Sequence, residues 1–255
     1  MTIDANALCA EYLEKVCDLM KRITVEEEEP MSRAAERLAD QIAADRLVHI
    51  FGPGGHSNIA SQEIFFRAGG LMHISAILDS GTMLTDGALR SMSIERLPGY
   101  GRIVIGDRGL GPQDVLILVN AYGINAALID GALEARDRGC FTIGVSSRKH
   151  AEETARDHVA RHPSAKNLHD VVDVAIDTKV PIGDALMRVP GLGEPTGASS
   201  TYASAIALNS LVLRTIALLL DRGIEPPVWR SGNAPGGDEA NSRFLDNFRG
   251  RVRTL

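Results

Sequence analysis

The chain has 255 residues and a formal net charge of −6, with 27 Lys and Arg against 33 Asp and Glu. A chain of this length can bury a sizeable core, and we expect a single domain. The acidic balance argues against a general nucleic-acid binder, because such binding depends on Lys and Arg that neutralise phosphates. The acidic net charge is still compatible with a small anionic ligand that is held by a few neighbouring groups of the protein.

Cysteines and apolar segments bear on the cellular compartment. The three cysteines, Cys9, Cys17 and Cys140, are an odd number at unrelated spacings. They indicate neither a disulfide framework nor a zinc site, so a reducing cytoplasm is predicted. The N-terminal segment lacks a basic stretch followed by an apolar core, and no run approaches about 18 uninterrupted apolar residues. We therefore expect a soluble cytoplasmic protein that is not attached to a membrane.

Two helices are predicted at the N-terminus. Apolar residues recur at helical spacing from about residue 4 to residue 23. A second helical stretch, MSRAAERLADQIAADR, follows Pro30. The acidic run at residues 26–29 lies between them, and acidic side chains near a helix start suit the helix dipole. We interpret this run as the solvated start of the second helix and not as a metal site.

Short β-branched runs then alternate with helical patterns. Five runs predict mostly buried strands: residues 47–52, 72–78, 114–120, 141–147 and 173–177. Strands that alternate with helices at these lengths form right-handed crossovers. The pattern therefore predicts a parallel sheet with helices on both of its faces.

A long apolar stretch and a tail follow the fifth strand. Residues 200–223 predict a core helix that ends at Gly223 and contains too many polar residues to span a membrane. The tail is rich in Pro and Gly and then resumes as a short helix. We expect one domain with a helical segment (1–45), a core (46–225) and a tail (226–255).

The segment GPGGHS, residues 52–57, joins the first strand to a helix. Glycines such as Gly54 and Gly55 allow positive φ and a close approach to a ligand. The first N–H groups of the following helix would point at an anion. His56 and Ser57 would then stand at the helix start with their side chains towards the ligand. A plain strand-to-helix turn is the alternative interpretation.

Three ligand classes compete for this turn. A nucleotide P-loop requires Lys before Ser or Thr, and here His56 stands at the Lys position. A dinucleotide fold is favoured by the G-x-G of Gly52 and Gly54 and by Asp79 after the next strand, but Ser57 replaces the third glycine. A sugar-phosphate loop needs small and hydroxyl residues from several strand ends, and Ser57 supplies the first hydroxyl.

Other predicted strand ends carry small and polar residues as well. They are Asn120, Tyr122, Gly123 and Asn125 after the third strand, Ser146 and Ser147 at the fourth, and Ser199, Ser200 and Thr201 before the long helix. In open parallel sheets, ligands bind at the carboxyl ends of the strands. This distribution favours a ligand site over a plain turn.

The chain resembles the sugar isomerase (SIS) domain family, in particular its stand-alone bacterial phosphosugar isomerases and sugar-binding proteins. The resemblance covers about residues 40–245 and rests on five segments: FGPGGHSNIASQEIFFRAGGL, SSRKH, RHPSAKNLHDVVDVAIDTKVPIGDAL, GEPTGASST and WRSGNAPGGDEANSRFL. It implies a three-layer α/β/α sandwich with a five-stranded parallel, flavodoxin-like sheet. It also implies a homodimer or homotetramer that binds a phosphorylated sugar at the strand ends.

The resemblance assigns roles to individual residues. The first-loop serine of the family falls on Ser57. The second, serine-rich loop falls on residues 120–123, where two hydroxyl anchors are missing, so backbone N–H groups, Tyr122 and Asn125 are the candidates to replace them. Glu194 resembles the glutamate before the serine–threonine pair in aminosugar isomerases of this family.

Aldose–ketose isomerisation needs a base, a donor for the carbonyl oxygen and a group that opens the ring, and it needs no metal or redox cofactor. Glu63 and Glu194 are candidate bases whose pKa burial would raise. His56 is the candidate ring opener or proton shuttle, because an imidazole works near neutral pH. Alternatively, His56 only contacts the phosphate or caps the helix, and Glu63 pairs with Arg67 at i,i+4.

His158 and His162 have the spacing of a metal pair, but Pro163 follows at once and no third ligand is near, so a metal site is not favoured. We predict a protein that binds a phosphorylated sugar and isomerises a hexose or amino-sugar phosphate without a cofactor. The alternatives are a non-catalytic sugar-phosphate sensor of the same fold, an amino-sugar phosphate lyase or deaminase, and a dinucleotide-binding protein. The sequence carries no helix-turn-helix pattern, which disfavours a DNA-binding regulator.

Overall fold

The structure, a computed structural model, describes residues 3–255. Its centre is a sheet of five parallel strands in the order β2-β1-β3-β4-β5. The strands are β1 (Val48–Phe51), β2 (Ile74–Ile77), β3 (Val115–Val119), β4 (Phe141–Ser146) and β5 (Val174–Asp177). This arrangement confirms the predicted strands and the flavodoxin-like sheet. The strand order reverses between β1 and β3, and ligands of such sheets bind in the crevice at that point.

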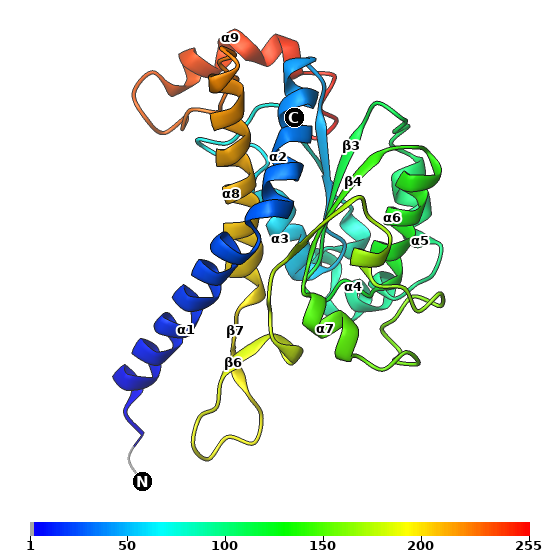
Figure 1. The fold of residues 1–255 in the computed structure, drawn as a ribbon, viewed down its shortest axis with the longest axis vertical. Helices are drawn as coiled ribbons and strands as arrows, with labels where there is room; N and C mark the ends of the chain where they lie inside the picture. Colours follow the sequence, from blue (N-terminus) through cyan, green and yellow to red (C-terminus); the bar gives the residue numbers. More distant parts are fainter. Residues whose placement is uncertain (1–2) are drawn as a thin grey trace.

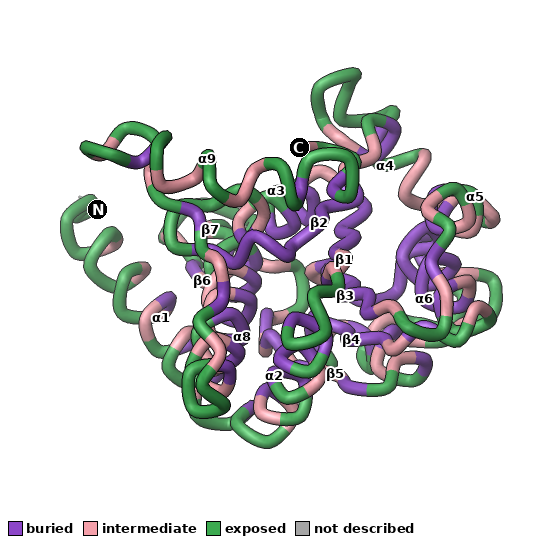
Figure 2. Tube along the Cα trace, turned by 90° about the horizontal axis from the view of Figure 1, so that it is seen from above, coloured by how far each residue is buried: buried purple, intermediate pink, exposed green. Residues whose placement is uncertain are grey.

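Helices cover both faces of the sheet and complete the predicted three layers (Figures 1 and 2). The helices of one face are α2 (Glu28–Ala43), α3 (Gly55–Glu63) and α8 (Ser200–Asp221), and those of the other are α5 (Tyr100–Gly106) and α6 (Ala126–Asp137). Alternate residues of β3 pack against opposite helix layers. Ile117 packs with α2 and α8, whereas Leu116 and Leu118 pack with α5 and α6. Both clusters are fully apolar, because parallel strands are buried on both faces.

The remaining elements lie at the margins of this sandwich. They are α1 (Ala5–Glu26), α4 (Ala88–Glu95), α7 (Arg148–Glu153), α9 (Gly237–Phe248), an antiparallel pair of β6 (Ala185–Met187) and β7 (Thr196–Ala198), and 3₁₀ turns at Ser80–Thr82, Leu84–Asp86, Leu168–Asp170 and Ile182–Asp184. Helix α1 extends beyond the sheet beside the β6–β7 hairpin (Figure 1). The C-terminal tail packs Trp229 and Phe248 on Met72, at the start of β2.

The acidic run between the first two helices is only partly a solvated helix start. Glu28 and Glu29 lie in the first turn of α2, as predicted. Glu26 and Glu27 instead pair with Lys179, whose Nζ lies 3.1 Å from Glu26 Oε2 and 2.7 Å from Glu27 Oε1. The prediction of a solvated helix start was therefore wrong for Glu27, which is buried, whereas Glu26 is solvated but ends α1. Lys179 is about 150 positions away in the sequence, so no local pattern could indicate it.

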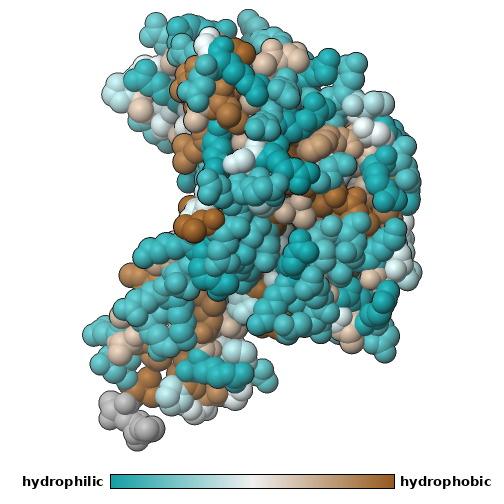
Figure 3. Space-filling model, in the orientation of Figure 1, coloured by the Kyte–Doolittle hydropathy of each residue, from teal (hydrophilic) through white to brown (hydrophobic). Residues whose placement is uncertain are grey.

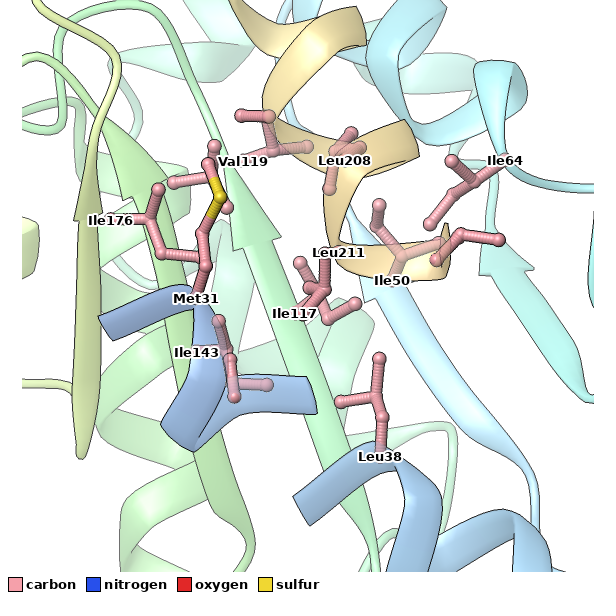
Figure 4. Packing of buried hydrophobic residues seen from close by; sticks show 14 of the residues in the cluster. Met31, Leu38, Ile50, Ile64, Ile117, Val119, Ile143, Ile176, Leu208 and Leu211 are labelled. Atoms are coloured by element: carbon pink, nitrogen blue, oxygen red, sulfur yellow. The ribbon is translucent and has the colours of Figure 1, made fainter. Parts of the chain in front are cut away.

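Helix α8 is the one described helix whose length and composition would suit a membrane span. In the structure, its small and branched residues Ala203, Ala207, Leu208 and Leu211 are buried against the sheet and α2. Figure 4 shows Leu208 and Leu211 directed at the side chains of the sheet. These contacts support the prediction of a core helix.

Candidate functional site

A small pocket of about 120 Å³ opens at the carboxyl ends of β1 and β3, where the strand order reverses. Its walls are the turn after β1, the turn after β3, Glu95 at the end of α4, and Asp184 near the start of α8. The predicted residues that the structure brings together in this pocket are Gly54, Gly55, His56, Ser57, Asn120, Tyr122 and Ser200. The pocket therefore lies where doubly wound sheets bind their ligands.

The glycine turn presents the start of α3 to this pocket. Gly54 precedes the helix with a φ of +112°, and the N–H of Asn58 is the first that bonds back, to Gly54 O at 2.9 Å. The N–H groups of residues 55–57 come before it and have no acceptor within the helix. Together with the helix dipole they favour an anion at this position. His56 is exposed beside them, whereas Ser57 is buried.

Gly54→Ala should weaken anion binding about tenfold or more and should also destabilise the fold, by about 1–3 kcal/mol. The reason is the positive φ together with a Cβ atom that would lie 2.8 Å from the carboxyl carbon of Glu95. Titration calorimetry with a sugar phosphate and urea unfolding measure the two effects. Gly69→Ala is the matched control, since Gly69 has a φ of +81° but open space around it. Equal affinity in both variants would mean that the turn does not hold the anion.

Asn120 connects the two turns of the pocket. It is only 2% exposed, and its Nδ2 lies 3.1 Å from each of Pro53 O, Ser57 Oγ and Glu95 Oε1. Its Oδ1 accepts the N–H of Tyr122 at 3.0 Å. Asn120 thus stands where the family resemblance implies serine anchors, and it holds the neighbouring groups in place by hydrogen bonds.

Glu95 is a pocket residue that the sequence analysis did not single out. Burial raises the pKa of Glu95 to about 7, against the opposing effects of the Asn120 hydrogen bond and the Arg96 charge. A carboxyl group with a pKa near neutrality can take up and release a proton at physiological pH. In the sequence, Glu95 is an ordinary acidic residue at the end of a short, mostly exposed helix, and no local signal distinguishes it.

The serines at the start of α8 are occupied by a carboxylate of the chain itself. Asp184 Oδ1 accepts the backbone N–H groups of Ser199 and Ser200, at 2.9 Å and 2.7 Å. The hydroxyl groups of both serines also donate to Asp184, at 3.0 Å and 2.6 Å. Thr201 follows on the exposed side of the helix. This helix start therefore already holds an anion, and only Ser200 and Asp184 reach the pocket wall.

The structure places the two predicted bases outside the pocket. Glu194 is exposed in the loop between β6 and β7, which extends away from the sheet (Figure 1). Glu63 ends α3, where its Oε1 accepts Asn209 Nδ2 at 3.2 Å and lies 3.6 Å from Arg67 Nη2. For Glu63 the geometry is that of the ion pair considered as its alternative role.

The predicted residues after β3 and β4 have different surroundings. Ser147 caps α7, and its Oγ donates to Val180 O at 2.6 Å. Ser146 packs on Gly123, where a Cβ atom would lie 2.6 Å from Ser146 Oγ. Asn125 precedes the first turn of α6 and lines a second, larger pocket. Ser146 and Ser147 thus support the local backbone, and Asn125 lines the second pocket.

The second pocket has a volume of about 530 Å³ and shares Glu95 and Tyr122 with the first. It lies between α4 and α7. The ring of Tyr122 stacks on His150 with ring centres 4.0 Å apart and planes inclined by 22°. Burial lowers the pKa of His150, and nearby positive charges lower it further, which favours the neutral form of its ring. The two pockets therefore adjoin at Glu95 and Tyr122.

The candidate residues for a metal pair and for a dinucleotide site already have hydrogen-bond partners in the structure. Within residues 3–255, no group of three or more His, Cys, Asp or Glu side chains is placed to hold a metal ion. His158 Nδ1 accepts a backbone N–H at 3.2 Å, whereas His162 Nε2 lies 3.2 Å from Asp130 Oδ1. Asp79, the candidate ribose-binding acid, accepts the hydroxyl of Tyr100 at 2.9 Å. These contacts do not favour a metal pair or a dinucleotide site.

A doubly wound parallel sheet with a pocket at its switch point defines a class of α/β proteins that bind small ligands. The SIS domain model matches residues 11–147, and the chain belongs to the SIS domain family. This finding confirms the predicted resemblance.

Similar proteins extend over nearly the whole chain. The UPF0309 proteins of Geobacillus kaustophilus and Halalkalibacterium halodurans are 33% and 34% identical, over 96% of this chain and 96% of theirs. Among solved structures, the phosphoheptose isomerase of Neisseria gonorrhoeae matches 86% of this chain and 97% of its own, with a TM-score of 0.50 and 18% identity. That of Francisella tularensis matches 84% and 100%, with a TM-score of 0.51 and 12% identity. At these identities the structures show a shared fold alone.

Proposed function

We propose that the protein binds a phosphorylated sugar in the pocket between β1 and β3 and interconverts its aldose and ketose forms. The N–H groups of residues 55–57 would hold the phosphate at the start of α3. The observation that carries the proposal is the Glu95 carboxyl group, which lines both pockets. Burial raises its pKa to about 7. A phosphate in the small pocket would direct the sugar carbons past this group.

In the proposed reaction, ionised Glu95 removes the proton from the carbon beside the carbonyl group. The electron pair of that C–H bond forms the C=C bond of an enediolate, whose negative charge lies on the former carbonyl oxygen. A proton then passes from the neighbouring hydroxyl group to that oxygen, and protonated Glu95 returns its proton to the former carbonyl carbon, which leaves the new C=O group on the other carbon. Burial favours the neutral carboxyl group formed in the first step, and Asn120 Nδ2 stabilises the ionised form at 3.1 Å. His56 lines the same pocket and supplies an imidazole for ring opening.

The test combines binding and proton exchange with the wild-type protein. A panel of pentose, hexose, heptose and amino-sugar phosphates is titrated by calorimetry and then followed by NMR in D₂O. At least one sugar phosphate should bind and should exchange its C1 or C2 proton with solvent. Tight binding without exchange in the entire panel would contradict the isomerase and would leave the alternative of a sugar-phosphate sensor.

The homodimer or homotetramer expected from the sequence stays a prediction. Exposed apolar side chains along two neighbouring helices support it, namely Leu13 and Val25 on α1 and Leu213 and Leu220 on α8. Figure 3 shows a concave outline on this side of the molecule, between the C-terminal helix and the projecting end of α1. Large exposed apolar side chains of this kind become buried when two subunits associate.

A further inference from the structure

The pocket between α4 and α7 is larger than the reacting carbons of a sugar phosphate require. Its volume of about 530 Å³ falls in the range of about 300–1,000 Å³ that is typical of pockets for drug-sized ligands. It shares Glu95 and Tyr122 with the first pocket, and its wall also includes His150, Ala155 and Ile182 but no residue of the glycine turn. A sugar phosphate anchored at α3 would therefore leave most of this space unfilled.

The walls of this pocket combine apolar side chains with polar groups that have no partner. Apolar atoms come from Met92, Ile124, Ala155, Ala160 and Ile182. Within the described part of the chain, Arg96 Nε, Asn125 Oδ1 and His150 Nδ1 are buried and make no hydrogen bond. Asn125 is only 5% exposed. These three atoms have almost no accessible surface, so a ligand in the pocket does not contact them directly. The side chains of Arg96 and Asn125 line the pocket, and their other N–H groups are the donors available to a ligand with an acceptor oxygen.

We propose that the ligand is a substituted sugar phosphate, with a largely apolar substituent joined through an amide or carboxyl group. The phosphate lies at the start of α3, and the substituent fills the pocket between α4 and α7. Its polar group pairs with Arg96 and Asn125, and its apolar part lies on Ile124 and Met92. This inference rests on the proposed function, because it takes the phosphate position from it.

Calorimetric titration with a graded set of probes tests the substituent. The probes are glucose 6-phosphate and glucosamine 6-phosphate that carries an N-acetyl, N-butanoyl or N-hexanoyl group. Each buried CH₂ group can improve affinity up to about fourfold, so the butanoyl compound should bind about fivefold or more tightly than the acetyl compound. Ala155→Trp should place an indole ring in the pocket and abolish this dependence on chain length. Ala155→Ser is the matched control and should behave as the wild type.

The outcomes separate this inference from the proposed function. If glucose 6-phosphate binds and all acyl compounds bind equally, the substituent site is refuted while the phosphate site stands. A dependence on chain length that survives in Ala155→Trp would also refute it, because the substituent would then lie elsewhere. If none of these probes binds but a pentose or heptose phosphate does, the substituent site is refuted while the phosphate site stands. If no sugar phosphate of the whole panel binds to the wild-type protein, the proposed function itself fails.

Discussion

Glu95→Gln should lower the rate of proton exchange by about 10³-fold and leave the dissociation constant of the sugar phosphate within about threefold. Glutamine has the same shape, and its carbonyl oxygen can still accept Asn120 Nδ2, but an amide cannot take up the proton of a C–H bond. In the wild type, the rate should rise about tenfold per pH unit below pH 7 and level off above it, because Glu95 must be ionised and its pKa is about 7. NMR exchange rates and calorimetry measure both quantities.

Two carboxylates outside the pocket serve as matched controls for this prediction. Glu194→Gln alters an exposed loop, and Glu63→Gln alters a residue paired with Arg67 and Asn209. Neither variant should change the exchange rate more than about twofold. A variant of Glu194 that loses exchange while Glu95→Gln retains it would assign the base to the β6–β7 loop.

The core of the fold could be predicted from the sequence because buried parallel strands leave a direct signal. The run DVLILVN became β3, in which all five strand residues are buried, and the other four runs became strands that are mostly buried. Long-range partners left no such signal. Glu27 looked like part of a solvated acidic run, and only the approach of Lys179 from the loop after β5 makes it a buried ion-pair partner.

The glycine-turn end of the candidate site was predictable, and the end formed by Glu95 was not. Glycines and polar residues at strand ends are local features, so residues 54–57 and Asn120 could be placed at one edge of the sheet. The pKa of Glu95 depends on desolvation by two turns that are distant in the sequence. Similarly, Ser199 and Ser200 resembled free hydroxyl anchors because nothing local shows that Asp184 binds them. Residue type and spacing do not contain this information.

The free energy of unfolding should carry a pH dependence that Glu95→Gln removes. Burial raises the pKa of Glu95 from 4.5 to about 7, so between these values the folded state holds a proton that the unfolded state has released. Stability therefore falls as the pH rises through this window, and it changes no further through Glu95 once both states are ionised. From pH 5 to pH 8 the wild type should lose about 2 to 3 kcal/mol relative to Glu95→Gln.

Urea unfolding at a series of pH values measures this difference and needs no knowledge of the substrate. Taking the difference between the two proteins at each pH cancels the titration of all groups that they share. Glu194→Gln is the control, and its difference from the wild type should stay flat, because Glu194 is exposed. A flat difference for Glu95→Gln would mean that Glu95 is ionised throughout this range. Its carboxylate would then be a weaker base, and the tenfold rise of the exchange rate per pH unit below pH 7 should also be absent.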